Sequence, residues 1–201
     1  MKIRVLYNVI LCRLGIRQLL PKDFINAIEI VECREKLVEF QGIKVRESVA
    51  EKLRRIESNL SLMSYGIQVV SGYRTLEEQL TLWQNAAGNR KFSADPTTGK
   101  GGGHQTGGAV DILLLKNGET VDMGSNYRDH NNRSITFPKD KGIITSEQLL
   151  QRQILYNAMI AEGFINYPGE WWHYCYGDQM WAAYSRKNRA VYGSIAGKEE
   201  L

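Results

Sequence analysis

The spacing of apolar residues predicts three helices. The first covers residues 46–65 and is followed by Gly66, a residue type that often ends helices. Its apolar positions are separated by four, three, four and three residues, as on one face of a helix: Val49, Leu53, Ile56, Leu60 and Met63. The other two, at 75–87 and 145–163, each begin with a capping-box pattern, a Thr followed three residues later by Glu or Gln.

Short apolar runs between these helices predict strands. Residues 67–70 and 108–115 are apolar enough for buried strands, and the aromatic run 171–176 is also strand-like. The segment 88–107 is rich in glycine and predicts a loop, while 122–144 is polar and irregular. We therefore expect an α+β fold, with a small, mainly antiparallel sheet and helices packed on it.

Length and composition favour one globular domain. The chain has 201 residues, of which 43% are hydrophobic and 24% charged, so a single domain spanning 1–201 can bury a core. No apolar stretch is long enough to predict a membrane span. The polar segment 185–201 is expected to fray at the C-terminus.

The cysteines and the N-terminus bear on the compartment. Three widely spaced cysteines do not form a disulfide framework and fit a reducing compartment, which favours a cytoplasmic protein. Residues 1–20 begin with a positive charge and a short apolar run, which keeps a periplasmic or exported protein as an alternative. Because that run has no small-residue cleavage site, a first strand or an irregular arm is favoured there.

The excess positive charge lies near the N-terminus. The net charge is +4, and the first 60 residues contain twelve Lys and Arg against eight Asp and Glu. Nucleic-acid binding is one interpretation of such a segment. A solvated helix face is favoured because the charges alternate in sign, so we expect no nucleic-acid partner.

Two histidines and two carboxylates lie in unusual local sequences. His104 ends a glycine-rich loop, and Asp111 lies within an otherwise apolar strand, where a carboxylate is costly to bury without a partner. Glu170 and His173 belong to the aromatic sequence Glu-Trp-Trp-His. Two imidazoles and one carboxylate suit a zinc site with a fourth position open for water. A second carboxylate, for which Glu170 is the candidate, could then take a proton from that water.

Each of these residues also has a simpler explanation. The histidines could be hydrogen-bonded groups of the surface or core, and Asp111 could accept backbone hydrogen bonds. Glu170 could be a solvated turn residue. The residues occur together in glycine-rich or tryptophan-rich patterns. Zinc chemistry is favoured over these simpler explanations once this grouping is combined with the family resemblance of the surrounding motifs.

Three further residues have open or minor roles. Cys175 would share a strand face with residue 173, so it is a possible metal ligand, although a small apolar core residue is favoured. Arg74 follows a strand and could bind a carboxylate or an oxyanion, or form a surface salt bridge. His130 lies in a polar stretch and is expected to be exposed.

Four motifs resemble the zinc D-alanyl-D-alanine dipeptidase family of the vancomycin-resistance type, within the zinc D,D-peptidases. They are Gly72-Tyr73-Arg74, His104-x-x-Gly107-x-Ala109-x-Asp111, Asp122-Met123-Gly124-Ser125 and Glu170-Trp-Trp-His173-Tyr174. The resemblance covers about residues 46–176, and residues 1–45 match poorly.

The resemblance implies a zinc cleft with one Zn²⁺ per chain, held by His104, Asp111 and His173. It implies that Glu170 is the general base and then the general acid. It also implies that Arg74 stabilises the tetrahedral oxyanion.

The substrate-binding positions depart from the family pattern. We expect Tyr73, Trp172 and Asp129 to bind substrate. The family's serine two residues before the first zinc histidine is replaced by Gly102, and its aspartate after Met-Gly-Ser is replaced by Arg128, with Asp129 shifted by one. The reaction class is therefore more firmly predicted than the substrate.

The expected function is zinc-dependent hydrolysis of a short peptide of D-amino acids, with D-Ala-D-Ala as the first choice. A D,D-carboxypeptidase or endopeptidase acting on longer cell-wall peptides is an alternative. A catalytically weak module that binds cell-wall peptide is another, although an intact Glu170 argues against it.

Overall fold

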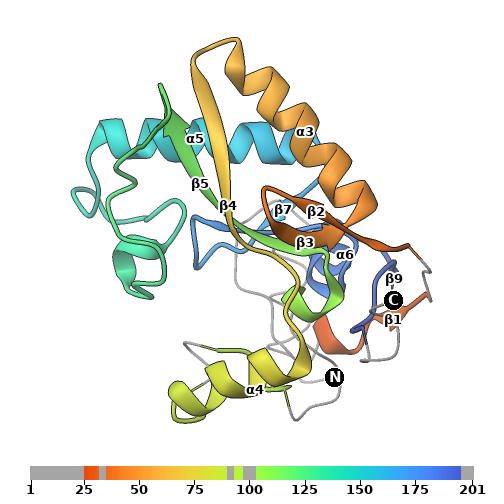
Figure 1. Ribbon diagram of the computed structural model, residues 1–201. Coiled ribbons are helices and arrows are strands. Elements are labelled where there is room, and N and C mark those ends of the chain that lie inside the picture. The colour runs from red at the N-terminus through yellow and green to blue at the C-terminus, as the bar shows by residue number, and fades with distance from the viewer. Residues whose placement is uncertain (1–24, 32–34, 90–92, 97–102, 196–201) are drawn as a thin grey trace.

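The structure is a computed structural model that describes residues 25–31, 35–89, 93–96 and 103–195. Its centre is a mainly antiparallel sheet in the order β4-β5-β8-β7, with β6 paired to β5 (Figure 1). The strands of this sheet are β4 (Tyr65–Ser71), β5 (Ala109–Lys116), β6 (Glu119–Thr120), β7 (Ile165–Asn166) and β8 (His173–Cys175). The expected α+β class is confirmed.

Two long helices, α3 (Glu47–Ser61) and α5 (Ser146–Ala161), contact each other and the sheet (Figure 1). The core between them contains alternate residues of β5, namely Val110, Ile112 and Leu114. Because strand side chains alternate between faces, Asp111 lies on the opposite face from these three residues. The sheet therefore has one face in the main apolar core and another that carries the polar site residues.

The helices follow the sequence pattern closely. Four of the five predicted apolar positions of α3 are buried, whereas Met63 lies beyond the helix and is exposed. Both predicted capping boxes are present, at Thr75 before α4 (Leu76–Asn85) and at Thr145 before α5. The predicted role of Gly66 is wrong, because the left-handed turn is made by Ser64 and Gly66 already belongs to β4.

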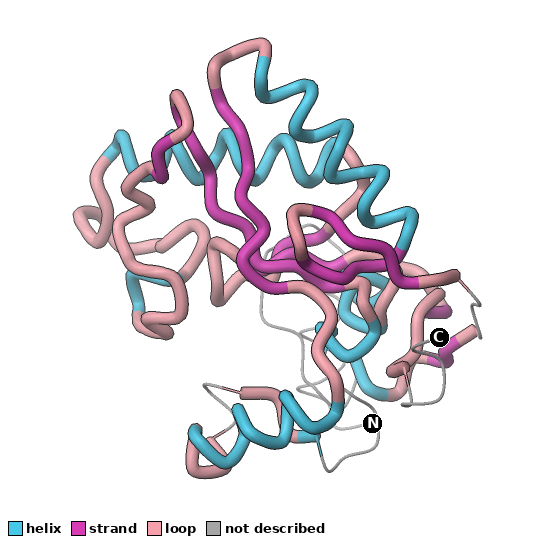
Figure 2. Tube along the Cα trace, viewed as in Figure 1, coloured by secondary structure: helices cyan, strands magenta, loops and turns pink. Residues whose placement is uncertain are grey.

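Loops lie on either side of β5. The short helix η2 (Gly103–Thr106) interrupts the loop predicted at 88–107. Figure 2 shows the long loop region between β6 and α5, which contains the short helix η3 (Asn132–Ser134) and lies beside the sheet. Two further strand pairs lie outside the main sheet. The strands β2 (Leu37–Phe40) and β3 (Ile43–Arg46) form a hairpin, and β1 (Glu29–Ile30) pairs in parallel with β9 (Arg189–Ala190).

The expectation of a frayed polar tail from Ser185 is wrong for the part that the structure describes. The helix α6 (Gln179–Tyr184) ends there, but β9 then pairs with β1, and Ala190, Tyr192 and Ile195 are buried. These apolar side chains hold residues 189–195 against the domain, whereas residues 196–201 lie outside the described residues.

Several expectations about the N-terminus and the cysteines concern undescribed residues. Residues 1–20, Cys12 and Cys33 are outside the described part of the chain, and Cys175 is a buried free thiol. None of the helices in the described segments combines the length and apolar character needed to cross a membrane.

Candidate metal centre

Asp111 and His173 face each other across two neighbouring strands. They are paired in register between β5 and β8, so their side chains leave the same face of the sheet. The Nδ1 atom of His173 lies 2.9 Å from Oδ1 of Asp111. Both side chains are buried, and the pairing results directly from the strand register.

His104 reaches the same carboxylate from η2. Its Nδ1 atom lies 2.7 Å from the carbonyl oxygen of Gly72, which leaves Nε2 pointing toward Asp111, 3.4 Å from Oδ1. One ligand atom from each of His104, Asp111 and His173 lies within 4.8 Å of the others, and all three residues are buried. The structure thus brings together the three residues that the sequence predicted as metal ligands.

Electrostatics couples these three groups. Burial alone would raise the pKa of Asp111, but the charges of the two histidines and the hydrogen bonds with them hold that pKa well below its usual range. Burial lowers the pKa of His104. Burial also acts to lower the pKa of His173, but the hydrogen bond and charge of Asp111 outweigh it, and the net shift is upward.

The other oxygen of Asp111 has two partners. The Tyr127 hydroxyl donates to Oδ2 over 2.8 Å, and Nη2 of Arg74 lies 3.5 Å from it. Nη2 of Arg74 also donates to Ser71 Oγ, and Nη1 donates to Gln79 Oε1. Among the described ion pairs, that of Arg74 is with Asp111, so the guanidinium is next to the ligand cluster instead of in a surface salt bridge.

Glu170 lies beside His130, which the sequence predicted to be exposed. Oε1 of Glu170 is 3.2 Å from Nδ1 of His130, and the side chain of His130 is only 14% exposed. The expectation that His130 is exposed is therefore wrong. The residue adopts a left-handed backbone conformation with φ 46°, which polar loop composition does not reveal.

The predicted substrate-binding residues occupy different environments. Trp172 is 1% exposed, and its ring makes edge contacts with Tyr127 and His130 at centroid distances of 5.7 and 5.6 Å. Tyr73 is partly buried, next to Arg74 in sequence. Trp172 is therefore a buried residue that packs against the side chains of Tyr127 and His130 and supports them.

The loop after Ser125 holds the two residues that depart from the family pattern. Asp129 is exposed, and its Oδ2 accepts a hydrogen bond from the backbone nitrogen of Asn126 over 2.8 Å. The Arg128 guanidinium lies over the ring of Tyr127, 4.8 Å from its centroid. Gly102, the third departure, is outside the described residues.

Cys175 lies on the side of His173 that faces away from Asp111. Its Sγ atom is 3.2 Å from Nε2 of His173, whereas Nδ1 faces the carboxylate. A metal bound between Nδ1 and Asp111 would therefore be on the other side of the imidazole ring from the thiol. Burial and the charge of Asp178 raise the pKa of the Cys175 thiol well above its usual range.

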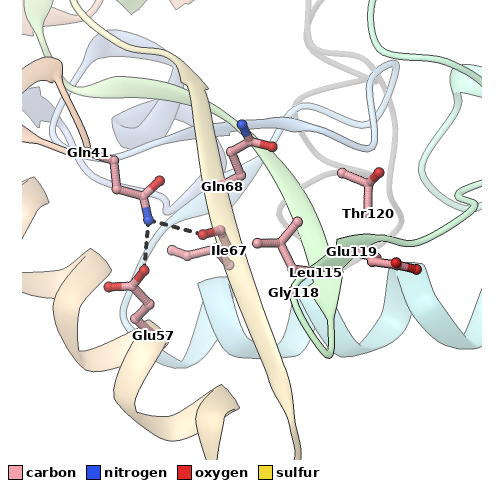
Figure 3. Close-up of a pocket in the computed structure, with 8 residues that line it drawn as sticks. All are labelled: Gln41, Glu57, Ile67, Gln68, Leu115, Gly118, Glu119 and Thr120. Atoms are coloured by element: carbon pink, nitrogen blue, oxygen red, sulfur yellow. Dashed lines mark hydrogen bonds between the residues drawn. The ribbon is translucent and has the colours of Figure 1, made fainter.

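A separate pocket lies along β4 and β5 (Figure 3). On one side of its lining, Gln41 donates to Glu57 Oε1 and to the carbonyl of Ile67. None of His104, Asp111 and His173 lines this pocket. The carboxylates in its lining are those of Glu57 and Glu119, and neither belongs to the His-Asp-His cluster.

Comparisons with known proteins agree with the motifs. Two curated D-alanyl-D-alanine dipeptidases match part of the chain. The protein from Synechocystis is 39% identical over an alignment of 88 residues, and the match covers 39% of this chain and 36% of that relative. The protein from Enterococcus faecalis is 37% identical over 73 residues, 35% of each chain. The matched segments thus span about a third of these relatives.

Solved structures of D,D-peptidases are similar at low identity. A vancomycin-resistance D,D-pentapeptidase from a VanB-type cassette, in complex with Zn(II), has a TM-score of 0.49 at 20% identity, covering 81% of this chain and 92% of that one. A vancomycin-resistance D,D-dipeptidase in complex with a D-Ala-D-Ala phosphinate analogue has a TM-score of 0.45 at 26% identity, covering 79% and 66%. The family model described as D-ala-D-ala dipeptidase matches residues 30–191, and the chain belongs to this family.

Proposed function

We propose that the protein is a zinc-dependent peptidase that hydrolyses a short peptide of D-amino acids, with D-Ala-D-Ala as the leading substrate. The observation that carries this proposal is the convergence of His104, Asp111 and His173 within 4.8 Å in a buried setting. Two neutral imidazoles and a carboxylate form a donor set suited to one zinc ion with an open position.

The charge balance of the cluster fits a divalent cation. Asp111 is held in its ionised form by its neighbours, and a carboxylate at this depth needs positive charge close by. The hydrogen bond of His104 Nδ1 to Gly72 leaves Nε2 free to bind metal. A bound zinc ion would lower the pKa of its water toward about 7 and polarise the substrate carbonyl.

Glu170 and Arg74 supply the remaining chemistry in this proposal. Glu170 accepts a proton from the attacking water and later returns it to the departing amine, so that the peptide bond is replaced by a carboxylate and a free amine. Arg74 provides a fixed positive charge beside Asp111, which stabilises the negative oxygen of the tetrahedral intermediate. Tyr73, Trp172 and Asp129 would shape the substrate site.

The choice of substrate rests on the relatives. The curated proteins from Synechocystis and Enterococcus faecalis carry the name D-alanyl-D-alanine dipeptidase, which makes this dipeptide the first candidate. A D,D-carboxypeptidase acting on longer cell-wall peptides is a second candidate, favoured by Arg128 in the place of the family's ammonium-binding aspartate.

The test compares substrates and variants of purified, zinc-loaded protein. We expect alanine release from D-Ala-D-Ala and slower release from a pentapeptide ending in D-Ala-D-Ala, with L-Ala-L-Ala as the control. Glu170→Gln should retain zinc and lose about 10²–10⁴-fold in rate, the usual contribution of an acid–base group. Elemental analysis of His173→Ala should show most of the metal gone. An unchanged rate in Glu170→Gln, or full zinc in His173→Ala, would contradict the assignment.

A further inference from the structure

The two histidines of the cluster are held differently at the nitrogen that faces away from Asp111. For His104, that nitrogen lies 2.7 Å from the carbonyl oxygen of Gly72. For His173, Nε2 lies 3.2 Å from the Cys175 sulfur. A metal-binding imidazole usually donates its second N–H to a carboxylate, carbonyl or water. A thiol is a weaker acceptor than these groups, so its ability to hold the imidazole depends on the group to which the thiol itself donates.

Behind the thiol lies the buried side chain of Asp178, which is 2% exposed. Its Oδ1 accepts a hydrogen bond from the backbone nitrogen of Trp181 over 2.7 Å and thereby caps α6. Its Oδ2 is buried and has no hydrogen-bond partner in the described part of the chain. A buried carboxylate oxygen without a partner is costly, so this atom calls for a nearby donor.

Gly103 shows how closely the two side chains approach the metal-binding segment. A Cβ atom added at Gly103 would lie 2.6 Å from Oδ2 of Asp178 and 3.5 Å from Sγ of Cys175. Both atoms therefore border the same point of the backbone, one residue before His104. Among the described residues, the Met180 sulfur is also an acceptor near the thiol, at 3.9 Å, and a thioether is a much weaker acceptor than a carboxylate.

We propose that Cys175 and Asp178 are positioning residues that fix His173 for metal binding through a directed chain of hydrogen bonds. The thiol donates its proton to Oδ2 of Asp178, and its sulfur then accepts the Nε2 proton of His173. With its proton on Nε2, the neutral imidazole presents the lone pair of Nδ1 to the metal beside Asp111. This inference rests on the proposed zinc site.

The direction of the chain is what Asp178 contributes. Without a carboxylate behind it, the thiol could donate to Nε2 instead, and the imidazole proton would move to Nδ1, where it blocks the metal. The Asp178 carboxylate has no proton to donate, so the thiol must donate its proton to this carboxylate and cannot donate it to Nε2 of His173. The short segment 173–178 thus contains the proposed metal ligand, His173, and the two residues that support it, Cys175 and Asp178.

Zinc affinity, measured by competition with a chelator, tests the proposal without relying on turnover. Cys175→Ala should weaken zinc binding by about 10–100-fold, the usual cost of losing such a support. Cys175→Ser is the matched control, because a hydroxyl can donate and accept in the same way, and its affinity should stay close to that of the parent. Asp178→Ser retains a cap for α6 but lacks Oδ2, and should resemble Cys175→Ala.

Equal zinc affinity in the parent, Cys175→Ala and Asp178→Ser would overturn the inference while leaving the zinc site intact. If Cys175→Ala does not fold, the comparison of Cys175→Ser with Asp178→Ser makes the same distinction. If the parent itself binds no zinc, the proposed function fails instead.

The tautomer of His173 gives a second measurement that needs no metal. Nitrogen-15 NMR of the metal-free protein, at a pH above the histidine range, should show the proton on Nε2 in the parent and in Cys175→Ser. In Asp178→Ser we expect a mixture of tautomers. The Nδ1–H tautomer in the parent, or an unchanged spectrum in Asp178→Ser, would overturn the proposed chain.

Discussion

The hydroxyl of Tyr127 donates to Oδ2 of Asp111 over 2.8 Å, on the side of the carboxylate away from its contacts with His104 and His173. Burial and the negative charge of Asp111 raise the pKa of Tyr127, so the hydroxyl keeps its proton at neutral pH. The loop after Ser125 thus takes part in orienting the carboxylate that we propose as a zinc ligand.

Tyr127→Phe should therefore weaken zinc binding without abolishing it. Oδ2 of Asp111 would keep Arg74 as a partner, so we expect about a tenfold loss of affinity, the lower end of the range for such supports. Chelator competition measures the change, and Tyr65→Phe, on β4 away from the cluster, serves as a control. Affinity equal to that of the parent would show that the hydrogen bond does not orient the ligand.

Arg152 holds the loop that carries Tyr127 and His130. This side chain of α5 is 1% exposed, and its guanidinium donates to backbone carbonyls of Met123, Arg133 and Ile135. Burial lowers its pKa to about 10, so it remains charged at neutral pH. One buried cation therefore fixes both ends of the loop segment through backbone atoms.

Arg152→Met should destabilise the protein by about 3–5 kcal/mol, because buried carbonyls lose charged donors. Urea unfolding measures this change. Arg55→Ala is the matched control, because its exposed ion pair with Glu162 is worth less than about 1 kcal/mol. A loss of stability in Arg152→Met no larger than in the control would contradict the role of Arg152 as the anchor of the loop.

The contrast between the cluster and this loop shows what a sequence can predict. Asp111 and His173 were predictable because a carboxylate inside an apolar strand and a histidine in an aromatic strand stand out from their surroundings, and strand pairing then joins them. The capping boxes at Thr75 and Thr145 were predictable because they are local patterns.

The positions of Tyr127 and His130 could not be predicted in the same way. Arg128 and His130 both adopt left-handed backbone conformations, which nothing in a polar loop sequence specifies. The placement of this loop depends on hydrogen bonds that Arg152 donates to the carbonyls of Met123 and Ile135, each more than 15 residues away in sequence. The sequence pattern of α5, which carries Arg152, indicates only which face of the helix is buried. Such long-range polar contacts have no periodic signal.

His130 gives a prediction about turnover. Its Nδ1 lies 3.2 Å from Oε1 of Glu170, so it can hold one carboxylate oxygen and leave the other for the attacking water. His130→Ala should lower kcat by about tenfold or more, within the range of a positioned acid–base group, while zinc content stays constant. His130→Asn can place a donor at the position of Nδ1 and should recover part of the loss. Equal kcat in the parent and His130→Ala would exclude this role.

Zinc affinity should fall as the pH falls. Asp111 raises the pKa of His173 in the metal-free protein, and zinc binds only the neutral imidazole. Protons therefore begin to compete above the ordinary histidine pKa of about 6.5, and affinity should drop by up to about tenfold per pH unit below the raised value. Chelator competition from about pH 8 to about pH 5 measures the slope. A constant affinity over this range would show that His173 is not a ligand.

Substrate specificity should depend on the loop that departs from the family pattern. A dipeptidase must bind the free ammonium of its substrate close to the scissile bond, and a carboxylate suits this task whereas a cation repels it. Arg128 stands at the family's aspartate position, and Asp129 follows it. The Asp129 carboxylate is exposed and accepts a hydrogen bond from the backbone nitrogen of Asn126, so a small rearrangement could bring it toward the substrate.

That rearrangement must occur after Ser125. Gly124 has φ 85° and is tightly enclosed, since an added Cβ would lie 2.8 Å from Oε1 of Gln148, and its nitrogen donates to Asp122. Gly124 therefore fixes the start of the loop, so the rearrangement that moves Asp129 must take place within residues 126–129.

We expect Asp129→Ala to raise KM for D-Ala-D-Ala strongly or to abolish its turnover, because the substrate ammonium loses its carboxylate partner. Asp129→Asn is the matched control, since its side-chain oxygen can keep the hydrogen bond from Asn126 while the charge is lost, and it should show the same defect. Steady-state kinetics with the dipeptide and with an N-acylated analogue separate recognition of the ammonium from damage to the loop. Unchanged kinetics with D-Ala-D-Ala in both variants would show that Asp129 does not bind the ammonium. In that case Arg128 would line the substrate pocket, and substrates with a blocked N-terminus or an acidic group at this position should be preferred.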